Sequence, residues 1–409
     1  MKKFDIPVHY KGSFITVIKN ARKNNDPRKK DFTPTLLDFG PAKFYLARHF
    51  GFCYGVENAI EIAYKTIDEN PGRKIYLLSE MIHNPNVNHD LLSMGVKFIM
   101  DTSGTQLVAW EEIKSDDIVI IPAFGTTLEI EKKLNKIGIN PYRYNTTCPF
   151  VEKVWNRSAE LGKQGFTVII HGKHYHEETR ATFSHSVQNS PSVIVRNLDE
   201  AKFLAAVIKG NKSADDFYTF FKGKYSEHFD VNKDLNKLGV VNQTTMLATE
   251  TQEIADLIKE TMIKVYGAVN LSEHYADTRD TLCYATNDNQ DATYGMLETT
   301  ADFAIVVGGY NSSNTTNIVK ICREEIQTYF IDSADRIISE NEINHFDIDK
   351  HSVVITKDYL PGKYPVEILI TSGASCPDAV VEAVIRKIIS FFENAKDIDT
   401  VVNDVVEAF

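Results

Sequence analysis

A chain of 409 residues exceeds what one hydrophobic core usually organises, and about 150 residues per domain predicts two or three α/β-sized units. Its hydrophobic share of 43% and charged share of 25% are typical of a soluble globular protein and exclude the disordered and fibrous classes. The net charge of −11 argues against nucleic acid or an anionic membrane as a partner, because both require a basic surface.

The distribution of apolar residues and cysteines favours a protein that stays in the cytoplasm. No apolar stretch approaches the roughly 18 residues of a membrane span, and the N-terminal residues lack the apolar centre of a signal peptide. The five cysteines are an odd number spread along the chain, unlike a secreted disulfide framework. We therefore expect a cytoplasmic enzyme with reduced thiols or a metal site.

Residues 1–42 contain a basic stretch, Asn-Asp-Pro-Arg-Lys-Lys around position 28, and only weak hydrophobic periodicity. We interpret them as an N-terminal extension outside the core units, in the form of a solvated arm.

From residue 43 onward a pattern occurs three times, and each copy begins with a cysteine just before an amphipathic helix. After Cys53, for example, the apolar residues Val56, Ile60, Ala63 and Ile67 recur at helical spacing. Each helix is followed by an aliphatic run that predicts a buried parallel strand, starting 22, 18 and 20 residues after its cysteine. These first strands are expected at 75–78, 166–170 and 303–307.

Two further strands follow in every copy. The second strands are expected at 96–100, 193–195 and 329–331, and the third at 118–121, 238–241 and 366–370. Alternation of strands and helices predicts three α/β units with parallel sheets, covering residues 43–147, 148–282 and 283–390, before a C-terminal tail at 391–409. An insertion at about 207–236 and a polar excursion at about 339–365 are interpreted as surface embellishments.

Polar loops follow the first strands at matching positions. His83, His176 and Ser312 stand 30, 28 and 29 residues after Cys53, Cys148 and Cys283. Ligands of parallel sheets bind at the carboxyl ends of the strands, so three units facing one another would bring three cysteines and three sets of polar loops to one point.

Three thiolates without a fourth near neighbour suit two kinds of metal centre. One is a zinc ion completed by water, and the other is a cubane iron–sulfur cluster with one iron left open. Cys322, inside a helical stretch, and Cys376, in a Gly-Ala-Ser-Cys-Pro loop, have no equivalents in the repeat and are interpreted as non-ligands.

Two polar runs have both a functional and an ordinary interpretation. Residues 171–180 combine imidazoles with carboxylates, which suits proton delivery but also a solvent-facing loop. Residues 311–316 follow Val-Val-Gly-Gly-Tyr and are uncharged, which suits a helix cap or a phosphate cradle.

Eight segments together resemble the 4-hydroxy-3-methylbut-2-enyl diphosphate reductase family, also called LytB. They run in family order across roughly residues 45–390, and an ordered set of this kind is highly specific. The segments are Gly-Phe-Cys-Tyr-Gly-Val at 51, Ile-His-Asn-Pro at 82, Thr-Thr-Cys-Pro-Phe-Val at 146, His-Glu-Glu-Thr at 176, Asn-Gln-Thr-Thr at 242, Asp-Thr-Leu-Cys-Tyr-Ala-Thr at 280, Val-Gly-Gly-Tyr-Asn-Ser-Ser-Asn at 307 and Thr-Ser-Gly-Ala-Ser at 371.

The resemblance implies a trefoil of three α/β units around one [4Fe-4S] cluster per chain, held by Cys53, Cys148 and Cys283 with the fourth iron open. It implies reductive removal of the hydroxyl group from (E)-4-hydroxy-3-methylbut-2-enyl diphosphate, which gives isopentenyl and dimethylallyl diphosphate as the last step of the non-mevalonate isoprenoid pathway. The electron donor would be a ferredoxin or a flavodoxin.

The resemblance also implies roles for single residues. Glu178 would supply protons, and Thr244 would orient the substrate hydroxyl or its water. The diphosphate would be held by His83, His176, Ser312, Ser313, Asn314 and Ser375. Phe124 stands where many bacterial members have a histidine, a form that resembles the plant and cyanobacterial branch.

Two other functions explain part of the same pattern. A non-catalytic iron–sulfur sensor would need the cysteines but not the diphosphate cradle. A zinc hydrolase would use the cysteines as ligands and Glu178 as its base.

Overall fold

The computed structural model describes residues 4–278 and 281–409, and the chain divides into two compact units. Of the described residues, unit 1 contains 4–57, 83–87 and 284–409, and unit 2 contains 58–82, 88–278 and 281–283. Residues 1–3 of the predicted extension and the Asp280 of the motif at 280 lie outside the described residues.

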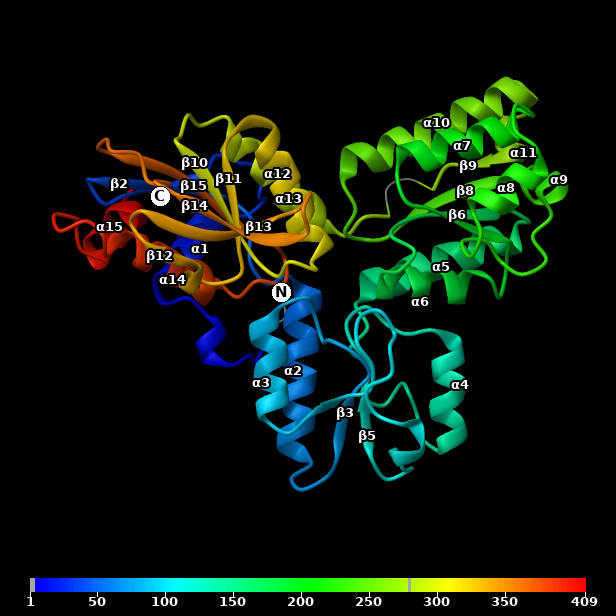
Figure 1. The fold of residues 1–409 in the computed structure, drawn as a ribbon, viewed down its shortest axis with the longest axis horizontal. Coiled ribbons are helices and arrows are strands. Elements are labelled where there is room, and N and C mark those ends of the chain that lie inside the picture. The colour runs from blue at the N-terminus through cyan, green and yellow to red at the C-terminus, as the bar shows by residue number, and fades with distance from the viewer. Residues whose placement is uncertain (1–3, 279–280) are drawn as a thin grey trace. The chain divides into compact units, whose positions relative to one another are not determined.

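The larger sheet of unit 2 is fully parallel, and its order is β7-β6-β8-β9. Its central strands β6 and β8 are buried at every position, which explains their continuous aliphatic sequences. Helices α5 and α6 cover one face of this sheet, and α7 and α10 cover the other (Figure 1). These elements are β6 (Thr167–His171), β7 (Ser192–Val195), β8 (Leu238–Asn242), β9 (Tyr275–Ala276), α5 (Pro149–Lys163), α6 (Glu177–Ser186), α7 (Leu198–Ile208), α10 (Ala248–Tyr266) and α11 (Leu271–His274).

Unit 2 also holds a smaller parallel sheet of order β4-β3-β5. Its strands are β3 (Ile75–Leu77), β4 (Lys97–Phe98) and β5 (Ile118–Ile120), followed by α4 (Leu128–Ile137). The boundary between the two units falls within α2 (Tyr54–Glu69) and α3 (Pro85–Ser93).

The main sheet of unit 1 has the order β1-β2-β15-β10-β11, and all its pairings except β1 with β2 are parallel. Ile368 in the central strand pairs with Phe44 on one side and Phe303 on the other. The elements are β1 (Thr35–Asp38), β2 (Ala42–Leu46), β10 (Phe303–Val307), β11 (Thr328–Ile331), β15 (Val366–Ser372), α12 (Tyr284–Leu297), α13 (Ser313–Glu325) and α14 (Asp378–Ile389).

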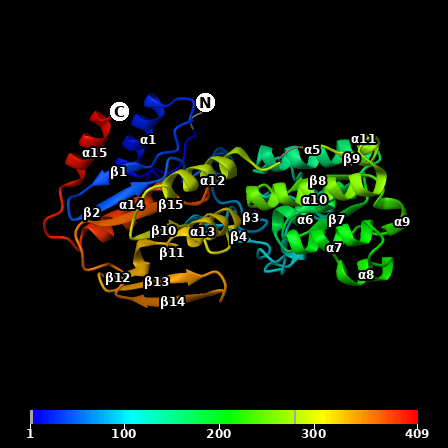
Figure 2. The same ribbon diagram turned by 90° about the horizontal axis from the view of Figure 1, so that it is seen from above.

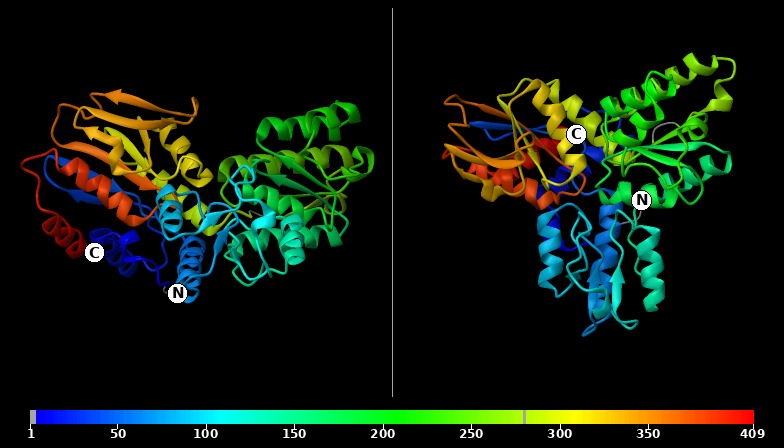
Figure 3. Two further views of the ribbon diagram at one scale, coloured as in Figure 1. Left: turned by 60° about the horizontal axis from the view of Figure 1, so that its bottom comes forward. Right: turned by 45° about the vertical axis from the view of Figure 1, so that its right-hand side comes forward.

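The polar excursion near 339–365 is largely a β-hairpin. Strands β12 (Ile337–Ser339), β13 (Glu342–Asp347) and β14 (Ser352–Lys357) form a separate antiparallel sheet, drawn in orange in Figure 3. Most of it is at the surface, as expected, although Ile343 is fully buried against the core of unit 1.

The interpretation of the N-terminal residues as a solvated arm is wrong. Helix α1 (Ser13–Asn25) buries Phe14, Ile15 and Ile18 in the main core of unit 1, and β1 is a strand of its main sheet. The C-terminal helix α15 (Ile398–Glu407) packs beside α1 and buries three valines in the same core (Figures 2 and 3). Burial of the apolar side chains of both helices in this core removes them from water, which stabilises the packed position of the two helices.

The interpretation of residues 207–236 as a surface embellishment is also wrong. They form α8 (Ala214–Phe220) and α9 (Val231–Asp234), and they bury Phe217, Phe221 and Phe229 in the core of unit 2. Phe217 stacks on Phe229 with the ring centroids 5.2 Å apart, so the aromatic residues of the insertion fill core volume.

The predicted α/β class with several parallel sheets is confirmed. A parallel sheet occurs in each of the three predicted segments, 43–147, 148–282 and 283–390, while the boundaries of these units stay a prediction. Within the described residues, none of the helices is both long enough and apolar enough to cross a membrane.

Candidate active site

Two neighbouring strands of unit 2 place a carboxylate beside a threonine. Strands β6 and β8 pair in parallel, so the loops at their carboxyl ends lie at one edge of the sheet. Thr244, in the loop after β8, donates its backbone N–H to Glu178 Oε1 at 2.5 Å and its hydroxyl to Glu178 Oε2 at 3.1 Å. Both side chains are almost fully buried, so the carboxylate is held in a fixed orientation.

Two of the predicted cysteine ligands lie in the same part of unit 2. The Cys283 backbone N–H donates to the Thr244 carbonyl oxygen at 3.2 Å, and the Cys148 N–H donates to the Ala123 carbonyl oxygen at 2.9 Å. The pKa of Cys148 is raised to about 12, mainly by burial and also by the nearby Cys283 and Glu178. Ionisation of all three groups, the two thiols and the carboxylate, is unfavourable at this proximity unless a cationic centre compensates their negative charges.

His176 caps the helix that carries Glu178. Its Nδ1 accepts the Glu178 backbone N–H at 3.2 Å, which fixes the imidazole at the start of α6. Phe124 lies edge-on to this imidazole, with the ring centroids 5.6 Å apart. Phe124, at the position where many bacterial members of the family have a histidine, therefore packs against His176, one of the residues predicted to bind the diphosphate.

Gln243 is a positioning residue that we did not predict. Its fully buried side chain accepts the Lys173 backbone N–H at 3.1 Å and the Thr179 hydroxyl at 3.0 Å. It thus ties the loop after β8 to the loop and helix after β6. The available signal was its place between the strand end and Thr244 in the Asn-Gln-Thr-Thr segment.

Unit 1 brings together the other predicted residues. Strands β2, β15 and β10 are adjacent and parallel, so the loops after them share one edge of the sheet. The Cys53 N–H donates to the Ala374 carbonyl oxygen at 3.2 Å, and the Ala374 N–H donates to Asn314 Oδ1 at 2.9 Å. In the same loop the Ser375 hydroxyl donates to the His83 carbonyl oxygen at 3.1 Å.

The amino terminus of α13 forms a polar cradle in this unit. Ser312 is the N-cap and accepts the Thr315 N–H at 3.3 Å, and Ser313 and Asn314 are the first two helical residues. All three side chains are nearly inaccessible, and Asn314 Nδ2 has no hydrogen-bond partner among the described residues. A helix amino terminus with buried hydroxyl and amide donors suits the oxygens of a phosphate group.

A glycine allows the close approach of two loops around this cradle. A Cβ atom at Gly309 would collide with the His83 backbone carbonyl group. Only glycine therefore lets the loop after β10 lie directly against the loop that carries His83.

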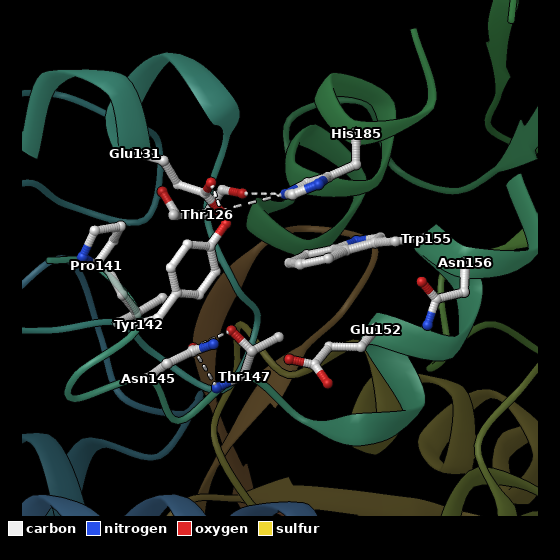
Figure 4. A pocket seen from close by; sticks show the side chains of 11 residues that line it. Thr126, Glu131, Pro141, Tyr142, Asn145, Thr147, Glu152, Trp155, Asn156 and His185 are labelled. Atoms are coloured by element: carbon white, nitrogen blue, oxygen red, sulfur yellow. Dashed lines mark hydrogen bonds and ion pairs between the residues drawn. The ribbon is translucent and has the colours of Figure 1, made fainter. Parts of the chain in front are cut away.

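A separate cavity of about 240 Å³ in unit 2 is lined by none of the predicted site residues (Figure 4). His185 Nε2 lies 3.2 Å from the Thr126 carbonyl oxygen, and Trp155 stacks on the His185 ring with centroids 3.8 Å apart. The Glu131 carboxylate lies 3.7 Å from His185 Nε2 and accepts the Tyr142 hydroxyl at 2.7 Å (Figure 4). These contacts support the 123–127 loop, which carries Phe124.

Exposure separates the five cysteines into two groups. The three predicted ligands, Cys53, Cys148 and Cys283, are partly exposed, whereas Cys322 and Cys376 are fully buried in hydrophobic cores. Cys53 belongs to unit 1, and Cys148 and Cys283 belong to unit 2. Among the described residues of either unit, no group of three His, Cys, Asp or Glu side chains forms a metal site by itself.

Comparison with known proteins identifies the family. A family model described as LytB protein matches residues 44–389. A relative from Crocosphaera subtropica, named 4-hydroxy-3-methylbut-2-enyl diphosphate reductase, is 43% identical over 85% of this chain and 85% of its own length. A relative of the same name from Trichodesmium erythraeum is 40% identical over 92% of this chain and 91% of its own. Both organisms are cyanobacteria, in agreement with the branch that Phe124 indicates.

Solved structures share the fold. A structure described as (E)-4-hydroxy-3-methyl-but-2-enyl diphosphate reductase, the terminal enzyme of the non-mevalonate pathway, superposes with a TM-score of 0.51 at 25% identity. It covers 85% of this chain and 99% of its own. A structure described as the E-1-hydroxy-2-methyl-but-2-enyl-4-diphosphate reductase from Plasmodium falciparum gives a TM-score of 0.59 at 21% identity. It covers 85% of this chain and 87% of its own. From its ordered motifs, its parallel sheets and these matches, the chain belongs to the LytB family.

Proposed function

We propose that this protein reduces (E)-4-hydroxy-3-methylbut-2-enyl diphosphate to isopentenyl diphosphate and dimethylallyl diphosphate. The observation that carries this proposal is the buried Glu178 carboxylate, fixed by two hydrogen bonds from Thr244 beside Cys148 and Cys283. A proton donor next to soft sulfur ligands suits the removal of a hydroxyl group as water.

The cofactor in this proposal is one [4Fe-4S] cluster per chain, held by Cys53, Cys148 and Cys283. The sulfur donors fit such a cluster, and the partial exposure of these three thiols, in contrast to Cys322 and Cys376, supports the choice. When bound, the cluster supplies single electrons and a Lewis-acidic iron at the reacting C–O bond.

Glu178 and Thr244 would handle the proton. Glu178 would donate a proton to the leaving hydroxyl group, and the two Thr244 donors keep its oxygens in one orientation. The Thr244 hydroxyl can turn toward the substrate hydroxyl, or toward the water formed from it, when the carboxyl group is protonated.

The diphosphate would be bound by hydrogen-bond donors of the polar loops. The start of α13 contributes backbone N–H groups, and Asn314 Nδ2 is a buried donor whose partner would be a phosphate oxygen. The full proposed set is His83, His176, Ser312, Ser313, Asn314 and Ser375. Fixing the diphosphate in this way holds the allylic carbon in place for reaction.

The remaining parts of the proposal rest on the sequence. Electrons would come from a ferredoxin or a flavodoxin, and the enzyme would act in the cytoplasm. The three α/β segments, 43–147, 148–282 and 283–390, would each contribute one of the repeated cysteines and one polar loop to the site.

The test is an anaerobic assay of the full-length protein with the substrate and a chemical one-electron reductant. Because removal of the hydroxyl group as water takes two electrons and two protons, the proposal predicts one molecule of isopentenyl or dimethylallyl diphosphate for every two equivalents of reductant consumed. Release of inorganic phosphate or diphosphate without any consumption of reductant would contradict it and would favour a hydrolase.

A further inference from the structure

Cys53 lies just after a tight turn that only glycine adopts easily. Gly51 has φ of +80°, and its backbone N–H donates to the Ser372 hydroxyl at 3.1 Å. The Cys53 N–H is bound to the Ala374 carbonyl oxygen, and α2 begins at the next residue. The position of the Cys53 thiol therefore depends on how firmly the turn at residues 50–53 is held.

Lys19 in helix α1 holds this turn directly. Its Nζ donates to the Phe50 carbonyl oxygen at 2.8 Å and to Asp378 Oδ1 at 2.7 Å, and it lies 4.0 Å from the centre of the Phe50 ring. A Cβ atom at Gly51 would meet both Asp378 Oδ1 and Lys19 Nζ, so this ion pair is in van der Waals range of the turn.

Aromatic residues before α1 reach the other residues that flank Cys53. The Tyr10 ring lies edge-on to Phe52 with centroids 5.8 Å apart, and the Phe4 ring lies edge-on to Tyr54 at 4.9 Å. Residues 50, 52 and 54 are thus each contacted by a side chain from the first 19 residues.

Helix α1 is itself anchored to α14. Glu382 accepts the Ser13 hydroxyl at 2.6 Å and the Phe14 backbone N–H at 3.1 Å at the start of α1. Glu382 and Asp378 lie four residues apart in α14 and therefore on the same face of this helix. Helix α14 thus binds the start of α1 through Glu382 and Lys19 through Asp378. These contacts fix the position of α1, and therefore of Lys19, relative to the turn at residues 50–53.

We infer that the N-terminal segment, residues 4–25, is a clamp on the Cys53 turn, with Lys19 as its main positioning residue. The clamp limits local opening of residues 50–54. Under the proposed function, on which this consequence rests, it also slows the loss of the cluster from Cys53. The clamp was not expected from the sequence, because the contacts that anchor it to α14 join residues more than 350 positions apart.

The test compares Lys19→Met with Lys19→Arg and with Lys23→Met, an exposed lysine on the same helix. Methionine keeps an apolar stem over Phe50 but loses the donor, and arginine keeps the charge. Amide hydrogen exchange is measured by mass spectrometry on the full-length protein as purified. We expect Lys19→Met to exchange about fivefold faster in the peptide covering residues 50–54, with β8 unchanged, and both other variants to resemble the wild type. Asp378→Asn should reproduce the effect of Lys19→Met.

Unchanged exchange at residues 50–54 in Lys19→Met, or an equal increase throughout the chain, would overturn the clamp. This readout does not need a cluster, so it stands or fails separately from the proposed function. A second readout, the decay of cluster absorbance under an iron chelator, should be about fivefold faster in Lys19→Met. A faster exchange with no change in this decay would overturn the consequence for cluster retention.

Discussion

The Glu178 carboxylate accepts two hydrogen bonds from Thr244, one from the backbone N–H and one from the side-chain hydroxyl. The backbone bond survives every substitution of Thr244 except proline, whereas the hydroxyl bond is lost in any residue without a hydroxyl at this position. The pair therefore allows the orientation of the carboxylate to be tested without removing it.

Thr244→Val should lower kcat about tenfold, because it removes one charge-assisted donor and leaves the shape of the side chain nearly unchanged. Thr244→Ser keeps the hydroxyl and should retain most of the activity. Steady-state kinetics of the two variants measure the difference. Equal activity of the valine and serine variants would exclude a role for the hydroxyl.

Glu178→Gln should lower kcat about 100-fold or more while substrate binding is kept, since glutamine has the size of glutamate but cannot act as an acid. Glu253→Gln, the same change at an exposed position of α10, is the matched control and should be fully active. Kinetics and the absorption spectrum of both variants are measured together. A fully active Glu178→Gln enzyme would remove Glu178 from the proton path.

Asn314→Asp should raise KM for the diphosphate about tenfold with a smaller change in kcat, because it replaces a buried donor near the start of α13 with an acceptor. Asn270→Asp makes the same change at an exposed site and serves as the control. If KM stays constant in Asn314→Asp, this side chain does not contact the diphosphate.

His171 should make unit 2 sensitive to acid. Burial lowers the pKa of His171 to about 4 from an ordinary value near 6.5. Between pH 6.5 and pH 4 this histidine is therefore protonated in the unfolded chain but neutral in the folded chain. Stability is therefore full above about pH 6.5 and is lost progressively as the pH falls toward 4, by up to about 3 kcal/mol.

The measurement is urea unfolding at pH 7 and at pH 4.5 for the wild type, His171→Gln and His89→Gln. His89 is an exposed histidine of α3, so His89→Gln is the control and should leave the acid sensitivity unchanged. In His171→Gln the loss between the two pH values should be smaller. An acid sensitivity identical in all three proteins would contradict the assignment to His171.

Ile18→Ala should destabilise the protein by about 2–4 kcal/mol, because Ile18 is fully buried in the core of unit 1. Val17→Ala, at a neighbouring side chain that is 45% exposed, should cost no more than about 0.5 kcal/mol. Thermal or urea unfolding gives the comparison. Equal effects would mean that α1 does not pack as described.

The parallel strands were predictable because they are buried on both faces and read as continuous aliphatic runs. Residues 303–307 were predicted as a strand and form β10 residue for residue. Helix α1 was missed because its buried apolar positions, Phe14, Ile15 and Ile18, cover little more than one turn, and charged residues follow them. The aromatic residues near 217–229 were misread because lysine and aspartate lie between them.

Some residues of the candidate site could be predicted from the sequence, but most of the contacts that position them could not. Strand ends and family motifs identify Glu178, Thr244 and Asn314 as single residues. The hydrogen bonds of Gln243, and those of Lys19 with the Cys53 turn, depend on loop conformations and on contacts distant in sequence. Local sequence patterns carry no information about such contacts.

The most direct test of the central claim is iron and sulfide analysis of anaerobically purified protein, with each cysteine substituted in turn. The wild type, Cys322→Ala and Cys376→Ala should contain about four irons and four sulfides per chain, and Cys53→Ser, Cys148→Ser and Cys283→Ser should lose them. Stoichiometric zinc in a colourless wild-type protein would contradict the account, as would a cluster that survives any of the three serine substitutions intact.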